Sequence, residues 1–294
     1  INYVFTFPKI NGRISGYYTE YLNKSQKISY YNDAYGTFVH HSISNANQRN
    51  YGVEAGVKYS VWKGLSLSLA GMWSKFTYTN VPDGTIRYEN NKADDVNGKV
   101  AIEGFHVGGS PEIVGTFGVQ YFWRYWWFEV NVNGIANNYL DPSYIQRSTN
   151  VLPDGQTENI KEKVYTAALD YFSKPVGEGG LGFDEATAEY LAVKTVQDYT
   201  GQVRLDDWSN IKNLPITMDI SVSKMIYLKG GKQLNIQLSV TNVLNNKRVK
   251  TGGYEQGRIP YYRDDFDVAN VNKFPAKYYY MQGLNVFLNV GFRF

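Results

Sequence analysis

The stretch that decides the fold is LNVFLNVGFRF, Leu284 to Phe294, with which the sequence ends. Apolar residues alternate along it with mostly polar ones, which is the pattern of a β-strand that has two different faces. In a soluble protein, such a strand ending on an aromatic residue would leave an exposed, aggregation-prone edge. In an outer-membrane β-barrel, the same strand closes the barrel and turns its apolar face to lipid. This stretch therefore favours an all-β, antiparallel transmembrane barrel.

The same alternation recurs in about nine segments along the chain. We expect strands at residues 1–7, 13–24, 50–61, 65–78, 112–123, 125–136, 214–228, 233–244 and 284–294. Short turns such as Trp62-Lys63-Gly64 alternate with long connections, which cover residues 25–48, 79–111, 137–213 and 245–277. Outer-membrane barrels have short periplasmic turns and long extracellular loops, whereas soluble sandwiches lack this regularity. The order of the connections places the end of the last strand at the periplasmic side.

Aromatic residues gather beside the short turns, where a barrel carries an interfacial girdle. They are Trp62, Trp123, Trp126, Trp127 and Tyr227. The chain is also rich in tyrosine, with 26 Tyr against 15 Phe. Tyrosine suits a membrane interface because its ring is apolar and its hydroxyl is polar. Composition alone leaves a tyrosine-rich soluble sandwich or propeller open, but core aromatics would not concentrate beside turns.

Composition excludes several classes of function. The net charge of +3 is too balanced to indicate a nucleic-acid partner. The absence of cysteine excludes disulfides and thiolate metal sites. The sequence opens on the strand-like residues 1–7 with no signal peptide, although an exported protein is made with one. We therefore expect residues 1–294 to be the C-terminal part of one transmembrane barrel domain in a longer protein.

Four stretches carry a resemblance to a known family. They are VTNVLNNKRV (Val240 to Val249), TGGYEQGR (Thr251 to Arg258), NKFPAKYYYMQGLNVFLNVGFRF (Asn272 to Phe294) and QRNYGVEAGVKY (Gln48 to Tyr59). Together they resemble the TonB-dependent outer-membrane receptors of the Bacteroidetes type, SusC-like or a related branch. The resemblance implies a 22-stranded barrel filled by a plug, of which this chain supplies roughly the last nine strands. The plug and the N-terminal regions of such a receptor are not in this sequence.

The resemblance implies active uptake of a nutrient ligand, namely an oligosaccharide, a peptide or a siderophore, into the periplasm. The expected partners are TonB, through the N-terminal part, and outer-membrane lipid. The resemblance does not decide whether a surface lipoprotein lid is a further partner, or which ligand is taken up. No cofactor and no bond chemistry are expected, so the chain is not expected to be an enzyme. Two alternatives remain: a receptor-like barrel that is a structural subunit of an outer-membrane complex, and a small porin or enzyme complete in itself. A TonB-recognising box upstream would favour transport.

Candidate functional residues fall into two groups, and neither contains a catalytic constellation or a metal site. Polar residues on one side of the expected strands are lumen-facing candidates: Glu54, Lys58, Glu129, Asn131, Asn133 and Asp219. Aromatic and arginine residues of the long loops are ligand-binding candidates, because such groups suit sugar rings and peptide backbones. They are Tyr30, Tyr31, Tyr35, Tyr139, Tyr144, Trp208, Tyr254, Arg258, Tyr261, Tyr262 and Arg263.

Two further features lie in the long loops. The neighbours His40 and His41 lack companion ligands for a metal, so we expect solvated loop histidines. Residues 183–196 predict a short helix, since Asp184 and Glu185 suit a first turn. Such a helix would pack within a loop at the barrel mouth.

Overall fold

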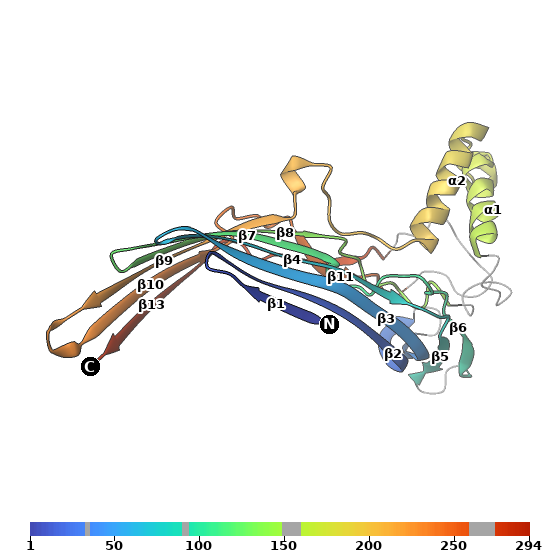
Figure 1. The fold of residues 1–294 in the computed structure, drawn as a ribbon. Helices are drawn as coiled ribbons and strands as arrows, with labels where there is room; N and C mark the ends of the chain where they lie inside the picture. The colour runs from blue at the N-terminus through green and yellow to red at the C-terminus, as the bar shows by residue number, and fades with distance from the viewer. Residues whose placement is uncertain (33–35, 90–93, 149–159, 259–273) are drawn as a thin grey trace.

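The computed structural model describes residues 1–32, 36–89, 94–148, 160–258 and 274–294, and Figure 1 shows their fold. Most of them form one curved antiparallel sheet, in which nine strands follow one another in the order β1-β2-β3-β4-β7-β8-β9-β10-β13. The short strands β5 and β6 extend this sheet from the N-terminal part of β3, where β5 pairs with residues 39–44. The predicted all-β, antiparallel fold is confirmed, and the expected segments correspond to the nine strands of this path.

The strands of the sheet are β1 (Asn2–Thr6), β2 (Ile10–Asn32), β3 (Thr37–Trp62), β4 (Leu65–Tyr78), β5 (Asp83–Tyr88), β6 (Val96–Lys99), β7 (Ile113–Trp123), β8 (Trp126–Ala136), β9 (Ile216–Tyr227), β10 (Gln233–Thr241) and β13 (Asn285–Arg293). A separate hairpin consists of β11 (Lys250–Tyr254) and β12 (Lys277–Tyr280). Two helices, α1 (Ile160–Ser173) and α2 (Glu185–Thr200), pack against each other in the connection between β8 and β9. None of the described helices is long and apolar enough to cross a membrane.

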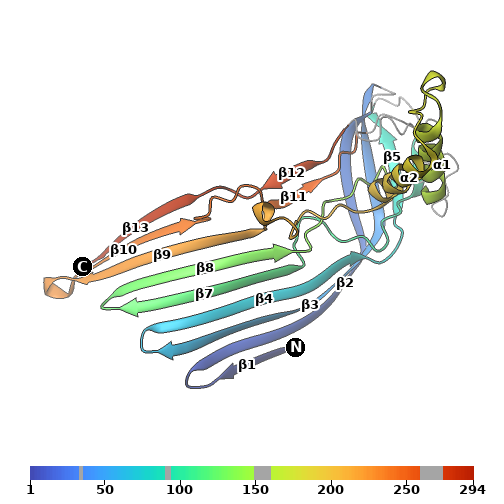
Figure 2. The ribbon, with the colours of Figure 1, turned by 90° about the horizontal axis from the view of Figure 1, so that it is seen from above.

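Short turns lie at one end of the sheet, and the long connections lie at the other (Figure 2). The β7–β8 turn consists of Arg124 and Tyr125, which both have positive φ, 46° and 67°. Two such residues make a turn whose twist matches that of the flanking strands. The β9–β10 connection is longer, residues 228–232, and contains Gly230 and Gly231 with positive φ of 80° and 76°. The last strand, β13, also ends at the short-turn edge.

The two faces of the sheet differ in chemistry from strand to strand. One cross-strand row is apolar over eight strands: Ile10, Tyr59, Leu67, Val119, Val130, Ile220, Val240 and Val286. The adjacent row on the other face is polar from β3 to β10: Ser60, Ser66, Gln120, Glu129, Ser221 and Ser239. Because successive side chains point to opposite faces, one face of the sheet is apolar and the other is polar.

The apolar face is not covered by any other described element. Leu69 is 57% exposed, Phe117 45% and Leu288 62%, and they lie on three separate strands, so the exposed apolar surface extends across the sheet. Monomeric soluble proteins rarely expose a contiguous apolar surface of this extent. The sheet therefore needs an apolar environment on this face.

The expectation that residues 25–48 form a loop is wrong. Strands β2 and β3 continue through them as one long hairpin, in register from Gln26↔Ile43 to Asn32↔Thr37. The stretch is polar overall, but Tyr30, Val39 and Ile43 are buried beneath the segments that follow β4 and β8. These strand residues are therefore buried by segments distant in the sequence, and for this reason the local pattern of the hairpin did not predict strands.

The long connections contain the buried core of the molecule. One cluster joins Tyr30 and Val39 of the β2–β3 hairpin to Ile86, Ile145 and Val164. Helix α2 confirms the predicted helix at 183–196, and its first turn is capped by the Asp184 carboxylate, which accepts a hydrogen bond from Thr187 N at 3.0 Å. Helix α1 is an addition that the sequence pattern did not predict.

The aromatic residues beside the short turns divide between the two faces. Trp123 and Trp126 pair across the β7–β8 turn in a row that continues the apolar face. Trp62 joins that face because a register shift after Ser60 pairs it with Leu65. Trp127 instead lies on the polar face, where its indole N–H points to Glu129 Oε2 at 3.4 Å. Of the five aromatic residues expected to form a girdle, Trp62, Trp123 and Trp126 are therefore the ones placed on the apolar face.

Candidate functional site

The six polar strand residues that the sequence singled out lie on one face of the sheet. A single cross-strand row contains Lys58, Asn131 and Asp219, with Ser68 and Gly118 between the first two. Glu129 and Asn133 lie two positions to either side of Asn131 on β8, and Glu54 lies four positions from Lys58 on β3. Even spacing along a strand keeps all of them on the same side.

This face, called the polar ribbon below, carries two groups of hydrogen-bonded side chains. Glu129 Oε1 accepts from Gln120 Nε2 at 3.1 Å and from Asn131 Nδ2 at 3.0 Å. Lys58 Nζ donates to Gln120 Oε1 at 2.7 Å, which brings β3 into the same network. Charge-assisted bonds of this kind fix the positions of side chains that would otherwise move independently.

The second group lies nearer the long loops and contains Asp219. Its Oδ2 accepts from Asn133 Nδ2 at 2.8 Å, and its Oδ1 accepts from the backbone N–H of Asn242 at 2.8 Å. Asn242 directly follows β10 and has a positive φ of 49°, and its side-chain amide donates to the carbonyls of Asn246 and Gln282. The recurrent Asn residues of VTNVLNNK therefore have a structural role, because they join the end of β10 to two neighbouring segments.

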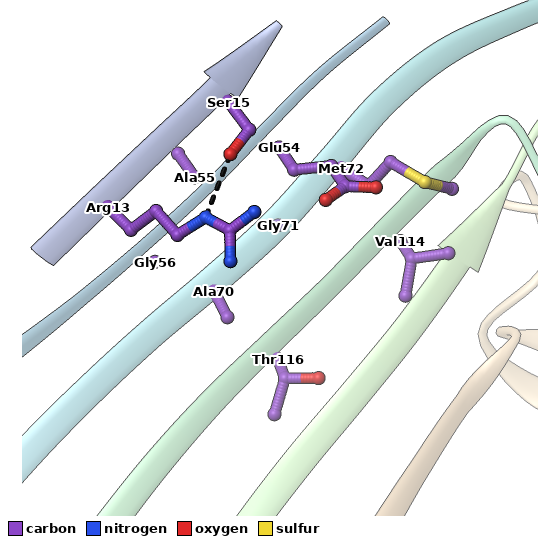
Figure 3. A pocket seen from close by; sticks show the side chains of 10 residues that line it. All are labelled: Arg13, Ser15, Glu54, Ala55, Gly56, Ala70, Gly71, Met72, Val114 and Thr116. Atoms are coloured by element: carbon purple, nitrogen blue, oxygen red, sulfur yellow. Dashed lines mark hydrogen bonds between the residues drawn. The ribbon is translucent and has the colours of Figure 1, made fainter. Parts of the chain in front are cut away.

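A shallow pocket of about 370 Å³ opens on the polar face near β2. Figure 3 shows Arg13 and Glu54 extending over a floor that small residues of β3 and β4 form. The Arg13 Nε donates to Ser15 Oγ at 2.9 Å and to Asn2 Oδ1 at 3.0 Å. Among the described residues, neither Arg13 nor Glu54 forms an ion pair. The pocket thus offers both a cation and an anion to whatever lies against this face.

A larger cavity of about 770 Å³ lies among the long connections. Tyr30, Tyr144 and Tyr254, three of the predicted ligand-binding residues, line it together although they come from three separate parts of the chain. Sequence reasoning did not single out Asp141 and Glu255, which line the cavity too. Glu255 lies within the TGGYEQGR stretch, so that stretch could have drawn attention to it, whereas no sequence pattern around Asp141 indicates a role.

Burial sets the protonation of groups that line this cavity. Burial raises the pKa of the Tyr144 hydroxyl, which therefore stays a neutral donor, and it donates to Gln26 Oε1. Burial also raises the pKa of the Asp141 carboxyl, although a hydrogen bond from Gly108 N opposes that shift. Tyr254 is only partly covered and presents its ring at the edge of the cavity. Aromatic faces beside hydroxyl and carboxyl groups can hold a polyhydroxylated or peptidic ligand.

The walls of the cavity are held by a buried ion pair and by glycine. Glu255 pairs with Arg147 and also accepts from the backbone N–H of Ser143 at 2.8 Å. Gly108 lies so close to Asp141 that a Cβ there would be 2.3 Å from Oδ1. The loop after β6 can therefore approach Asp141 only because residue 108 lacks a side chain.

The other predicted loop residues lie outside the cavity lining or outside the described residues. Tyr31 packs edge-on against Phe38, with ring centroids 5.5 Å apart, and the Arg258 guanidinium lies 5.9 Å from the Tyr31 ring centroid. Tyr139 stacks on His106 at 3.8 Å, and Trp208 Nε1 donates to Ile135 O at 3.1 Å. Tyr35, Tyr261, Tyr262 and Arg263 lie outside the described residues.

The expectation of two solvated histidines is wrong for His41. Its side chain is fully buried on the inner face of the β2–β3 hairpin, and this burial lowers its pKa to about 4. His40 points to the opposite face, since neighbours along a strand alternate. Its Nδ1 lies 2.7 Å from Ser29 Oγ and its Nε2 lies 3.0 Å from Glu89 Oε1. The second contact connects the hairpin to Glu89, the residue that follows β5.

No group of three or more His, Asp or Glu side chains that could hold a metal ion occurs in the described part of the chain. The two candidate functional features are therefore the polar ribbon of the sheet and the tyrosine-lined cavity at its long-loop end. No protein-family model matches this chain, and a search of curated proteins likewise gives no match.

Proposed function

We propose that this sheet is part of a transmembrane β-barrel in the bacterial outer membrane, and that the protein is a TonB-dependent receptor for uptake of a nutrient. The observation that carries the proposal is the exposed apolar face across eight strands, opposite a hydrogen-bonded polar ribbon. In a barrel, the first face meets lipid and the second faces the lumen. The C-terminal motifs that resemble such receptors agree with this arrangement.

The orientation follows from the connections. The short-turn edge, where β13 ends, lies at the periplasmic side, and the long connections with the tyrosine-lined cavity face the cell exterior. A ligand would first meet Tyr254 and Tyr144 in the cavity and then pass along the polar ribbon. TonB, acting on a plug supplied by the rest of the protein, would open that route. The described chain contributes binding and a polar path, and no bond chemistry.

The cavity favours a ligand rich in hydroxyl or amide groups over a strongly anionic one. Asp141 and Glu255 line it together with the cation Lys27, and the nearby Arg147 already pairs with Glu255, so the lining has no excess of positive charge. Tyrosine rings suit the apolar faces of sugar rings and the planes of peptide groups. We therefore place oligosaccharides and peptides before ferric siderophores.

The experiment is uptake by cells that carry the full-length protein, with and without a functional TonB. A panel of fluorescent oligosaccharides, peptides and ferric siderophores would be offered to both strains and to a strain lacking the protein. Uptake of one ligand that needs both the protein and TonB supports the proposal. If no ligand depends on TonB, while loss of the protein dissociates an outer-membrane complex, the protein is a structural subunit.

A further inference from the structure

We propose that the short-turn edge of the sheet binds the phosphate groups of anionic phospholipids, with Arg124 and Lys224 as the principal ligands. The inference rests on the proposed membrane location and adds a lipid-headgroup site to it. It begins from the distribution of charge along this edge. Each short connection, and the end of β13, carries at least one cation: Lys9, Lys63, Arg124, Lys229, Lys232 and Arg293.

Acidic side chains are missing from the same edge. Residues 7–11, 61–65, 122–127, 224–234 and 290–294 contain no Asp or Glu. Among the described residues, no ion pair includes any of these cations or Lys224. A soluble surface normally intersperses both signs of charge, so the one-sided edge indicates an anionic partner.

Arg124 and Lys224 form the most organised part of the edge. Lys224 lies on the apolar face, in the cross-strand row of Trp126 and Ile236. Its Nζ is 4.8 Å from the Trp126 ring centroid and donates to the Arg124 carbonyl at 3.0 Å. The Arg124 guanidinium is 5.1 Å from the Trp123 ring centroid. Aromatic rings therefore hold both cations close together without neutralising them.

The surroundings decide which anion fits. The row that contains Lys224 lies near the short-turn end of the exposed apolar face, with only the row of Ile226, Leu234 and Phe292 beyond it on β9, β10 and β13. The exposed Tyr125 and Tyr227 rings at this end pack edge-on against each other, with ring centroids 5.1 Å apart. A ligand here must offer an anionic head to the cations and an apolar chain to the adjoining strands. A phospholipid meets both conditions, whereas free phosphate meets only the first. Arginine can also bind phosphate through two parallel hydrogen bonds.

The experiment uses the full-length protein in nanodiscs of phosphatidylcholine that contain a fixed minority of phosphatidylglycerol. Native mass spectrometry after gentle release would count the lipids of each kind that stay bound. We expect a preference for phosphatidylglycerol of at least about fivefold over its share of the bilayer. The double variant Arg124→Gln/Lys224→Gln should lose most of this preference, and Arg124→Lys/Lys224→Arg should keep it. Lys194→Gln, on the distant helix α2, is the matched control.

The outcomes separate the two proposals. Failure of the wild-type protein to enter nanodiscs of either composition overturns the proposed membrane location. Entry without any preference between the two lipids, or an unchanged preference in the double glutamine variant, overturns only the lipid site. Inorganic phosphate is added as a competitor: if it displaces the bound lipid at millimolar concentration, the site recognises phosphate alone and the proposed lipid specificity is wrong. Recovery of the preference in the charge-keeping variant shows that any loss comes from charge rather than misfolding.

Discussion

Arg147 and Glu255, which are 108 residues apart in the sequence, form a buried two-pronged ion pair. Arg147 Nη2 lies 3.1 Å from Glu255 Oε1, while Nη1 donates to Oε2. The two side chains are only 3% and 10% exposed. Arg147 Nη2 also donates to Gly201 O at 2.8 Å, so that three long-loop segments meet at one guanidinium.

This pair predicts a large effect when one partner is removed. Glu255→Ala should leave Arg147 buried without its counter-charge, which destabilises the loop assembly by about 3–5 kcal/mol. Hydrogen–deuterium exchange should then increase at both residues 140–148 and 250–258. Glu103→Ala is the control, because Glu103 is exposed and forms no ion pair with another described residue. Faster exchange in only one of the two segments would show that the pair does not couple them.

His41 predicts a pH dependence of the β2–β3 hairpin. Burial lowers its pKa to about 4 in the folded protein, whereas an unfolded histidine titrates near about 6.5. Between these two values the unfolded hairpin binds a proton that the folded one does not, so stability falls as the pH falls through this window. Exchange at residues 37–44 should therefore accelerate between about pH 6.5 and pH 4. His41→Leu should remove this acceleration, and His40→Gln should retain it.

Tyr254 gives the most direct test of the tyrosine-lined cavity. Its ring lies at the cavity edge and is 37% exposed, so that truncation removes contact area from a ligand with little loss of core packing. If the cavity binds the ligand of the proposed receptor, Tyr254→Ala should weaken that binding by about 1–3 kcal/mol, roughly 5- to 150-fold, at an unchanged melting temperature. Calorimetric titration of the full-length protein measures this. Tyr190→Ala, in an exposed position on α2, should bind like the wild type; equal affinity of both variants would contradict a role for the cavity.

The two faces of the sheet predict opposite responses to a charge. Leu69 and Ser68 are adjacent on β4 and face opposite sides, with Leu69 in the apolar rows and Ser68 in the row of Lys58 and Asn131. Leu69→Arg should cost about 2–4 kcal/mol of folding free energy in a bilayer. Ser68→Arg should be tolerated because water and polar side chains surround it. Folding into lipid vesicles, followed by tryptophan fluorescence, compares the two; similar losses would refute the assignment of faces.

Gly253 and Gly252 form a matched pair in the TGGYEQGR stretch. Gly253 has φ of +147°, and a Cβ there would lie 2.2 Å from Lys277 O, whereas a Cβ at Gly252 would meet Tyr279 at an ordinary 3.5 Å. Gly253→Ala should therefore strain the β11–β12 hairpin by about 1–3 kcal/mol, and Gly252→Ala should leave it intact. Limited proteolysis at residues 250–258 distinguishes them. Equal protection of both variants would mean that the backbone adapts without cost.

The strands of the sheet could be predicted from the sequence because the environment of each face produces a pattern of alternating residues within the strand itself. Each strand that borders a uniform apolar surface needs an apolar residue at every second position, as in residues 65–69 and 233–240. The extension of the β2–β3 hairpin through residues 26–43 could not be predicted in this way. Its buried residues Tyr30, His41 and Ile43 are covered by segments from elsewhere in the chain, so its sequence contains polar residues on both faces.

The sequence by itself determined the two-faced antiparallel sheet, its short-turn and long-loop edges, and the single face that carries Glu54, Lys58, Glu129, Asn131, Asn133 and Asp219. These features follow from period-two alternation and from turn chemistry, which act over a few residues. Only the tertiary structure decided which tyrosines share the cavity, that Glu255 meets Arg147, and that His41 is buried. Those relationships depend on contacts between residues far apart in the chain, and no local pattern encodes such contacts.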